Sequence, residues 1–353
     1  FFIIYDLSNC IFYDIIIKDN YKLSKSKKEK KNMNKTFDIN ELYEITIQKL
    51  KEYNLIDKNE IIKLTPNYEI IINCKKYSHY IIECKFSSKK YFLKVFKNRD
   101  NIFQCNDYIK NYFDEFENRK FPIILVPRFK YNQMEYYITS FVNGESINNI
   151  HFPLNREQYK KIAYDVYNIW FELTKIKTLK YSEKGKFFIE DAATIFKKKL
   201  EDRLRHPVFN KISKIELEKT YSKCCDIIVN CDFSKPSLIH MDIKPANIVY
   251  DSESKLVTLI DFEHARFGDI DFGWTQILLS GINSFGKVYE ELIYPHIIEN
   301  GISLPEALKI PKFKCYIFYQ TACNLIYYYE NNAPCPINME KCFYYLLDEL
   351  AKE

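Results

Sequence analysis

The chain has 353 residues, of which 47% are hydrophobic and 28% are charged. This composition is that of an ordinary globular protein, and the length allows two lobes that each have their own core. The formal net charge of +5 is mild and spread along the chain. It therefore gives no reason to expect a nucleic-acid partner.

The eleven cysteines include no C-x-x-C pair and no His/Cys cluster with the spacing of a zinc site. An odd number of cysteines without a disulfide-like layout is typical of reduced thiols in the cytosol. The sequence therefore predicts a cytoplasmic protein without structural zinc.

The first 32 residues differ in character from the rest of the chain. Their apolar run is interrupted by Asp6 and Asp14, and a basic tract over residues 22–31 follows it. The run is too short for a transmembrane span, and it lacks the charged start and cleavage site of a signal peptide. We interpret residues 1–32 as an extension upstream of a natural start at Met33, either not native or disordered. A membrane-surface anchor is the alternative.

A helix is predicted over residues 39–50, and runs rich in Ile, Tyr, Phe and Val follow it at residues 68–73, 80–85 and 91–96. Polar breaks at 74–79 and 86–90 separate these runs, which predicts an antiparallel meander. In the third run Lys94 alternates with Leu93 and Val95, so its side chain should point to the opposite face of the sheet.

Further helices are predicted at residues 104–116, 192–204 and 215–230, with a strand over 135–144 that ends in an Asn-Gly turn. Within the helical segment 151–237, one apolar stripe consists of Ile162, Val166, Ile169, Leu173 and Ile176. Asn155 and Gln158 read as a capping box at the start of that helix. The C-terminal region is again helical and carries an aromatic run over residues 316–329.

The segment 238–263 carries the chemistry of the chain. Its sequence holds His240, Asp242, Asn247 and Asp261, with strand-like runs and a turn-rich stretch between the last two. Phosphoryl transfer needs a carboxylate that orients and deprotonates the attacking hydroxyl. It also needs hard oxygen ligands for Mg²⁺. This pattern supplies both, with Asp242 as the base and Asn247 and Asp261 as the metal pair.

With these residues the chain resembles the aminoglycoside phosphotransferase/choline kinase family, within the wider protein-kinase-like fold. Lys244 and Pro245 also sit where the catalytic loop of protein kinases carries Lys-Pro. Two departures argue against a protein kinase. The metal motif reads Asp-Phe-Glu at Asp261 and no Ala-Pro-Glu follows, and 96 residues separate Gly144 from His240. The resemblance spans roughly residues 55–345 and is most specific over 238–273.

The resemblance implies an α+β, two-lobed protein-kinase-like fold. A small antiparallel-sheet N-lobe over residues 33–142 would bind the nucleotide. A larger, mainly helical C-lobe over 143–353, with a helical insert, would hold the catalytic loop and the acceptor pocket.

The resemblance also implies nucleotide contacts. Lys94 would grip the α- and β-phosphates, and Lys244 would point at the γ-phosphate. Ser78, on the turn between the first two strands, would contact the β-phosphate. The backbone of Ser140 and Val142 would meet the adenine edge.

Three further roles concern supporting residues. An acidic residue on the helix over 104–116 should position Lys94; Asp107 is nearest to the expected place, and Gln104 is the competing register. His240 would hydrogen-bond the catalytic loop rather than titrate. Asp271 would brace that loop from below, with Asp269 as the alternative.

The function that the resemblance implies is transfer of the γ-phosphoryl group of ATP or GTP to a hydroxyl of a small molecule, with Mg²⁺ as cofactor. An aminoglycoside-type antibiotic is the first expectation for the acceptor, which would make the protein an antibiotic-resistance factor. Glu201 and Glu330 are the acidic residues that would line its pocket. A choline, ethanolamine or sugar kinase and a pseudokinase-like binding module are the alternatives. The sequence leaves the oligomeric state and the choice between ATP and GTP open.

Overall fold

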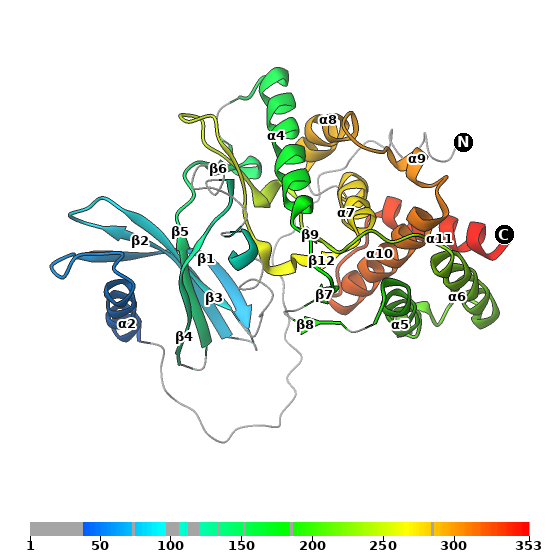
Figure 1. Ribbon diagram of the computed structural model, residues 1–353, viewed down its shortest axis with the longest axis horizontal. Helices are drawn as coiled ribbons and strands as arrows, with labels where there is room; N and C mark the ends of the chain where they lie inside the picture. The colour runs from blue at the N-terminus through cyan, green and yellow to red at the C-terminus, as the bar shows by residue number, and fades with distance from the viewer. Residues whose placement is uncertain are drawn as a thin grey trace.

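The computed structural model has two lobes, one built on a sheet and one built on helices (Figure 1). The residues that it describes are 38–72, 75–96, 106–109, 111, 120–132, 134–150, 153–183, 186–188, 190–283 and 286–352. The extension 1–32, Met33 and Gln104 lie outside them. In this described part of the chain, no helix is long and apolar enough to cross a membrane.

The smaller lobe is an antiparallel five-stranded sheet in the order β1-β2-β3-β5-β4. Its strands are β1 (Ile62–Ile72), β2 (Lys75–Cys84), β3 (Lys90–Phe96), β4 (Ile124–Tyr131) and β5 (Met134–Ser140). Helix α2 (Ile39–Glu52) begins at Asp38, whose side chain accepts a hydrogen bond from the Asn40 N–H. It buries Leu42, Thr46 and Leu50, which are spaced four residues apart and so share one face.

The first two strands are longer than the sequence predicts. Strand β2 already begins at Lys75 and pairs with β1 along its length, so residues 75–79 belong to a strand and not to a turn. The predicted break over 74–79 is therefore wrong for the residues described. The reason is that the sheet pairing stabilises polar residues in an extended conformation that their own propensity does not favour.

The chain passes into the helical lobe through β6 (Glu145–Ser146) and the 3₁₀-helix η2 (Ile147–Asn149). Strand β6 pairs with β10, a strand of the segment that carries the motif. The connection from the smaller lobe is therefore hydrogen-bonded directly to the hairpin that begins at Ile248.

Helices of the larger lobe pack on one extended core. They are α4 (Arg156–Lys175), α5 (Ala192–Leu204), α6 (Lys214–Val229), α7 (Ile270–Ile282), α8 (Tyr294–Ile298), α9 (Leu304–Ala307), α10 (Pro311–Glu330) and α11 (Ile337–Lys352). Three short helices accompany them: η3 (Pro207–Phe209), η5 (Phe262–His264) and the π-helix η6 (Tyr289–Ile293). The capping box of Asn155 and Gln158 at the start of α4 is present as predicted. The predicted two-lobed α+β fold is confirmed.

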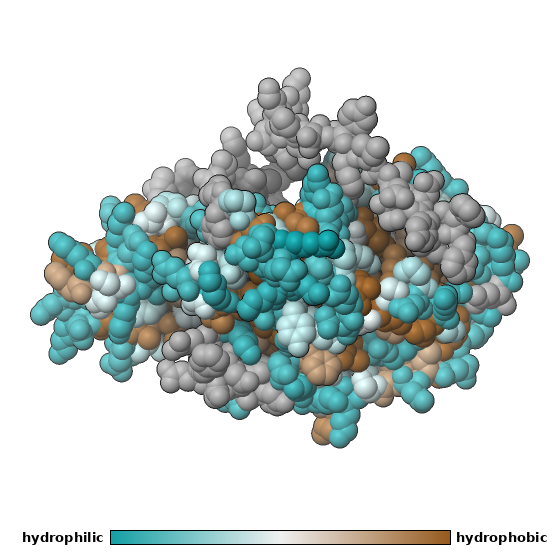
Figure 2. All heavy atoms as spheres, turned by 90° about the horizontal axis from the view of Figure 1, so that it is seen from above, coloured by the Kyte–Doolittle hydropathy of each residue, from teal (hydrophilic) through white to brown (hydrophobic). Residues whose placement is uncertain are grey.

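Short strands frame the motif inside this lobe. They are β9 (Ser237–Ile239), β10 (Ile248–Tyr250), β11 (Val257–Leu259) and β12 (Arg266–Gly268), with η4 (Pro245–Asn247) between the first two and the hairpin β7 (Ser182–Glu183) and β8 (Lys186–Phe187) nearby. β10 pairs with β11 and β12 pairs with β9. On the face shown in Figure 2, hydrophilic and hydrophobic residues are interspersed over the described surface.

Candidate active site

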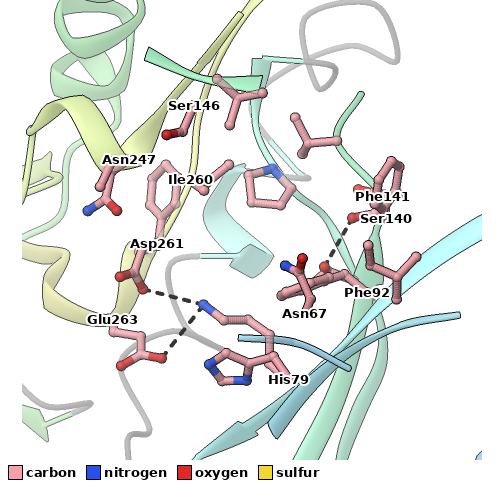
Figure 3. Close-up of a pocket in the computed structure, with 18 of the residues that line it drawn as sticks. Asn67, His79, Phe92, Ser140, Phe141, Ser146, Asn247, Ile260, Asp261 and Glu263 are labelled. Atoms are coloured by element: carbon pink, nitrogen blue, oxygen red, sulfur yellow. Dashed lines mark hydrogen bonds and ion pairs between the residues drawn. The ribbon is translucent and has the colours of Figure 1, made fainter. Parts of the chain in front are cut away.

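A cavity of about 960 Å³ lies between the two lobes. Figure 3 shows side chains from both lobes facing one another across it. The sheet side is lined by His79, Ile81, Phe92 and Lys94, the connection between the lobes by Ser140, Phe141 and Val142, and the helical side by Lys244, Asn247, Asp261 and Glu263. The volume is sufficient for a nucleotide-sized ligand.

His240 connects the start of the loop that carries Asp242 to the segment that leads to Asp261. Its ring is fully buried, and its Nδ1 atom accepts a hydrogen bond from the Asp242 N–H at 3.2 Å. The other ring nitrogen, Nε2, lies 3.0 Å from the Ile260 carbonyl oxygen and therefore carries the proton. Burial is the main reason that the pKa of His240 is lowered. The ring is thus a neutral link between two backbone segments.

The Asp242 side chain is fixed from two directions. The Asn247 Nδ2 atom donates to the Asp242 carboxylate and to the Asp242 carbonyl oxygen, both at 2.9 Å. The Lys244 ammonium lies 2.9 Å from the same carboxylate oxygen. These contacts close a tight loop in which the carboxylate cannot rotate freely.

Asn247 and Asp261 come together because the Ile260 N–H donates to the Asn247 carbonyl oxygen at 2.9 Å. Asp261 then adopts a left-handed conformation with φ of 68°, which turns its carboxylate into the cavity. Such a conformation is strained in a residue other than glycine, and strained residues of this kind cluster at functional sites.

The donor set here fits Mg²⁺ bound together with a nucleotide. Asn247 uses its amide nitrogen on Asp242, which leaves its Oδ1 atom as an oxygen ligand beside the Asp261 carboxylate. In the part of the chain described, no group of three or more His, Cys, Asp and Glu residues is placed to hold a metal by itself. Mg²⁺ takes six ligands and commonly binds through one or two carboxylates plus phosphate oxygens and water. Asn247 and Asp261 therefore offer two oxygen ligands of the kind that Mg²⁺ uses when phosphates and water supply the rest.

Lys94 projects from β3 into the cavity, while Leu93 and Val95 are buried on the other face. Its ammonium lies 3.4 Å from an Asp261 carboxylate oxygen and 3.7 Å from one of Glu263 (dashed lines in Figure 3). Burial lowers the pKa of Lys94, but Tyr137 and these two carboxylates outweigh that effect, so its pKa lies above the usual value.

The contact with Lys94 also changes the pKa of Asp261. Burial raises the pKa of its carboxyl group, but the cations around it, Lys94 first, hold the pKa below its ordinary value. The lysine and the carboxylate therefore both stay charged, and each is balanced by the other.

The expected partner of Lys94 on the N-lobe helix is not what the structure shows. Asp107 is exposed, and among the residues that the structure describes, the carboxylates in contact with Lys94 are those of Asp261 and Glu263. The competing residue Gln104 lies outside the described residues. The acidic partner comes from the metal segment because β3 directs the lysine across the cavity rather than toward the exposed side of that helix.

Ser78 does not face the cavity. It lies inside β2, one residue before His79, and successive side chains of a strand point to opposite faces. His79 and Ile81 line the cavity, so Ser78 lies on the face of Tyr80 and Ile82, which are buried in the core of the smaller lobe. The expectation that Ser78 contacts a phosphate is therefore not supported.

His79 is a cavity residue that the sequence analysis missed. Its Nδ1 atom accepts a hydrogen bond from the Val95 N–H at 3.1 Å. The β2–β3 ladder ends at the pair Tyr80 and Leu93, so the imidazole satisfies the next backbone donor. Burial and the neighbouring Lys94, opposed by Asp261, lower the pKa of His79 to about 4. Correct strand boundaries would have revealed this residue by its alternation.

Ser140 and Val142 lie in the connection between the lobes and line the cavity. The Ser140 hydroxyl accepts from the Ile123 N–H at 2.9 Å, and the Ser140 N–H donates to the Ile123 carbonyl oxygen at 2.8 Å. The end of β5 is therefore held to the segment before β4, which fixes the backbone of the connection.

Asp271 and Asp269 do not brace the catalytic loop. The Lys312 ammonium of α10 lies 2.9 Å from the Asp271 carboxylate and 2.7 Å from that of Asp269. Both residues belong to the start of α7, where the helix faces α10. The loop is contacted further along the same helix, by Gln276 and Ser280.

Glu201 and Glu330 each contact a side chain of their own surroundings. Glu201 pairs with Arg205 one turn further along α5. Glu330 lies 3.5 Å from His206 and its side chain is 62% exposed. Within the described chain, neither has a contact with the catalytic loop among its hydrogen bonds and ion pairs.

Comparisons with known proteins agree with this geometry. Residues 131–278 match the model of the phosphotransferase enzyme family APH. No curated protein matches the sequence. The fold is similar to the crystal structure of the aminoglycoside phosphotransferase APH(4)-Ia, with a TM-score of 0.63, 12% identity, and coverage of 88% of this chain and 98% of that chain.

Two further structures extend the likeness. A thermostable mutant of APH(4)-Ia in ternary complex with ADP and hygromycin B matches with a TM-score of 0.61 and 11% identity, over 86% of this chain and 96% of that chain. A putative fructosamine-3-kinase from Haemophilus somnus 129PT matches with a TM-score of 0.54 and 13% identity, over 86% and 95% of the two chains. At these identities the structural likeness establishes the fold, and the match over residues 131–278 supports a phosphotransferase. The predicted family resemblance is confirmed.

Proposed function

We propose that this phosphotransferase-like chain is a Mg²⁺-dependent small-molecule kinase. It transfers the γ-phosphoryl group of ATP or GTP to a hydroxyl of its acceptor. The observation that carries the proposal is a pair of contacts at a nucleotide-sized cavity: Asn247 holds the Asp242 carboxylate on the helical side, and Lys94 reaches Asp261 across the cavity from the sheet side.

The proposed division of labour follows from the contacts. Asp242 orients the acceptor hydroxyl and accepts its proton while the hydroxyl oxygen attacks the γ-phosphorus and the nucleoside diphosphate leaves. Asn247 and Asp261 hold Mg²⁺, which when bound neutralises charge on the phosphates. Lys94 binds the α- and β-phosphates, and Lys244 lies between Asp242 and the cavity, where it would meet the γ-phosphate.

The adenine or guanine base would bind at the connection between the lobes. The backbone groups of Ser140 and Val142 are the proposed contacts, supported by their place in the cavity lining. Ile81, Phe92 and Val249 supply apolar surface in the same cavity. Apolar walls with a few fixed polar groups are the usual composition of a nucleotide site.

An aminoglycoside-type antibiotic is the first candidate acceptor, since aminoglycoside kinases are prominent among the structures that share this fold. Glu201 and Glu330 remain the acidic residues proposed for its pocket, although Glu201 already pairs with Arg205 and Glu330 already contacts His206.

A metabolite alcohol or sugar is the second candidate, and one observation favours it. Burial first, then Arg266 and Arg203, lower the pKa of Lys199 to about 7, so near neutral pH Lys199 is partly neutral while the two neighbouring guanidinium groups stay charged. Arg266 pairs in β12 with Ile239, three residues before Asp242. A concentration of positive charge this close to the loop would repel a polycation and accept a neutral or anionic molecule.

An acceptor screen tests the proposal. ADP or GDP release would be followed with Mg²⁺ and ATP or GTP across aminoglycosides, macrolides, choline, ethanolamine and reducing or amine-linked sugars. We expect turnover with at least one class, and a turnover lower by about 10²- to 10⁴-fold after Asp242→Asn. A folded wild-type protein that binds nucleotide but transfers no phosphoryl group to any of these acceptors would contradict the kinase proposal and favour a binding module.

A further inference from the structure

Helix α7 carries two polar side chains toward the catalytic loop. Most of the helix is apolar and buried, including Trp274, Ile277 and Leu278. Gln276 and Ser280 lie one turn apart on a single face, because residues four apart are neighbours on a helix. The Gln276 Nε2 atom donates to the Ser280 hydroxyl at 3.0 Å, so the two side chains act as one unit.

This pair holds both backbone groups of Ile243, the residue directly after Asp242. The Gln276 Oε1 atom accepts from the Ile243 N–H at 3.3 Å. The Ser280 hydroxyl lies 3.0 Å from the Ile243 carbonyl oxygen and 2.9 Å from the carbonyl oxygen of Gln276 in its own helix, so these two acceptors share its proton. Ile243 is fully buried, and its peptide groups have no access to water as a substitute.

The loop needs such support because its backbone is not relaxed. Met241 has a φ of 64°, in the left-handed region that residues other than glycine rarely adopt. Its strain persists only when surrounding contacts determine the conformation. His240 fixes the loop on one side of Asp242, and the α7 pair fixes it on the other.

We infer that Gln276 and Ser280 are positioning residues for the carboxylate of Asp242. This inference rests on the proposed kinase function. Neither residue lines the cavity, and in the described part of the chain their hydrogen bonds reach the loop at the backbone of Ile243, next to the base. Catalytic geometry must hold to roughly 0.5 Å, and a displacement of about 1 Å can cost on the order of 100-fold in rate.

The test compares Gln276→Met and Ser280→Ala with a control on the same helix, Thr275→Val. Thr275 is also fully buried, but its hydroxyl bonds the Phe272 carbonyl oxygen and Gln320 on the side of α10. We expect the first two variants to lower kcat by about 10- to 100-fold with KM for the nucleotide within about twofold of wild type. We expect the control to lose thermal stability to a similar degree while keeping kcat.

Hydrogen exchange supplies a readout that does not depend on the acceptor. Peptides covering residues 240–248 should exchange faster in Gln276→Met and Ser280→Ala than in wild type, and at the wild-type rate in Thr275→Val. Faster exchange at Ile243 with an unchanged kcat would overturn the positioning role alone. So would an equal loss of kcat in all three variants. A wild-type protein inactive toward every acceptor would overturn the proposed function and this role together.

Discussion

The two walls of the cavity are built in different ways. On the helical side, His240, Asp242 and Asn247 hold one another through backbone and side-chain hydrogen bonds within a short stretch of chain. On the sheet side, Lys94 is a long side chain whose charged end is held by carboxylates from the opposite wall. The helical side is therefore held by contacts within its own segment, whereas the charged end of Lys94 on the sheet side is held by contacts from the opposite side.

This difference has a consequence for nucleotide binding. Asp242 should keep its position whether or not a nucleotide is present, since its contacts lie within its own loop. Lys94 should change partners, because phosphates and a metal compete for both it and Asp261. Substitutions in the helical wall should therefore change turnover, and substitutions around Lys94 should change nucleotide affinity.

The largest expected effect is that of Asp242→Asn. Removal of the base should lower kcat by about 10²- to 10⁴-fold, while the dissociation constant of the nucleotide stays near the wild-type value. The matched control is Asp251→Asn, in the turn between β10 and β11, where the carboxylate bonds Ser254 at 2.6 Å. Steady-state kinetics and nucleotide titration check both variants. A loss of nucleotide affinity equal to the loss of rate would mean that Asp242 acts in nucleotide binding and not in turnover.

The next effect concerns the sheet wall. Lys94→Met should weaken nucleotide binding and lower kcat/KM by about 10²- to 10³-fold, because a preorganised cation facing the phosphates is lost. Glu263→Gln should have a smaller effect in the wild-type background and almost none in the Lys94→Met background, since its contact is to the lysine.

A double-mutant cycle with Mg²⁺ titration separates this role from metal binding. If Glu263 acts through Lys94, the half-saturating Mg²⁺ concentration stays unchanged in Glu263→Gln. A raised Mg²⁺ requirement with additive effects of the two substitutions would instead make Glu263 a metal ligand.

The sequence predicts the helical wall well because its geometry is local. The offsets from His240 to Asp261 bring the loop and hairpin together through short-range pairing, and the structure joins these residues in one network. The expectation that Ser78 contacts a phosphate is wrong because it depends on where the strand begins. A shift of one residue along a strand moves a side chain to the opposite face of the sheet. His79 then took the place in the cavity that Ser78 was expected to occupy.

The remaining differences depend on tertiary contacts. Whether Asp271 or Gln276 reaches the catalytic loop is decided by how α7 lies across that loop, which no spacing in the sequence encodes. The partner of Lys94 depends in the same way on the direction of β3 across the cavity. The charge of Glu201 and Glu330 is visible in the sequence, but the packing of the helices determines which side chains they contact.

His79 offers a test of the sheet wall by pH. Burial first, with Lys94, holds its pKa at about 4 in the folded protein, against an ordinary value of 6.5. Below pH 6.5 the unfolded chain therefore binds a proton that the folded chain does not, so stability falls as the pH falls toward 4. The loss at pH 4 should be about 3 kcal/mol, and above pH 6.5 this contribution vanishes.

The variant His79→Asn keeps an acceptor for the Val95 N–H but does not titrate. The free energy of unfolding, measured by denaturant titration at pH 7, 5.5 and 4, should fall less steeply with acid in this variant. Some acid sensitivity will remain, because the pKa of the buried His240 is lowered as well. Parallel curves for the variant and the wild type would mean that His79 is protonated in the folded state.

The smallest effects are expected far from both walls, at Glu201 and Glu330. Glu201 pairs with Arg205 and Glu330 contacts His206, both carboxylates lie at exposed positions, and exposed contacts of this kind contribute at most about 1 kcal/mol to stability. Glu201→Gln and Glu330→Gln should therefore leave the melting temperature nearly unchanged.

Their effect on KM for the acceptor decides between the two acceptor classes. A strong rise in KM for an aminoglycoside, with kcat unchanged, would assign these helices to a pocket for a polycation, because ground-state binding alone would be lost. An unchanged KM would remove these two carboxylates from acceptor binding and favour a neutral or anionic alcohol.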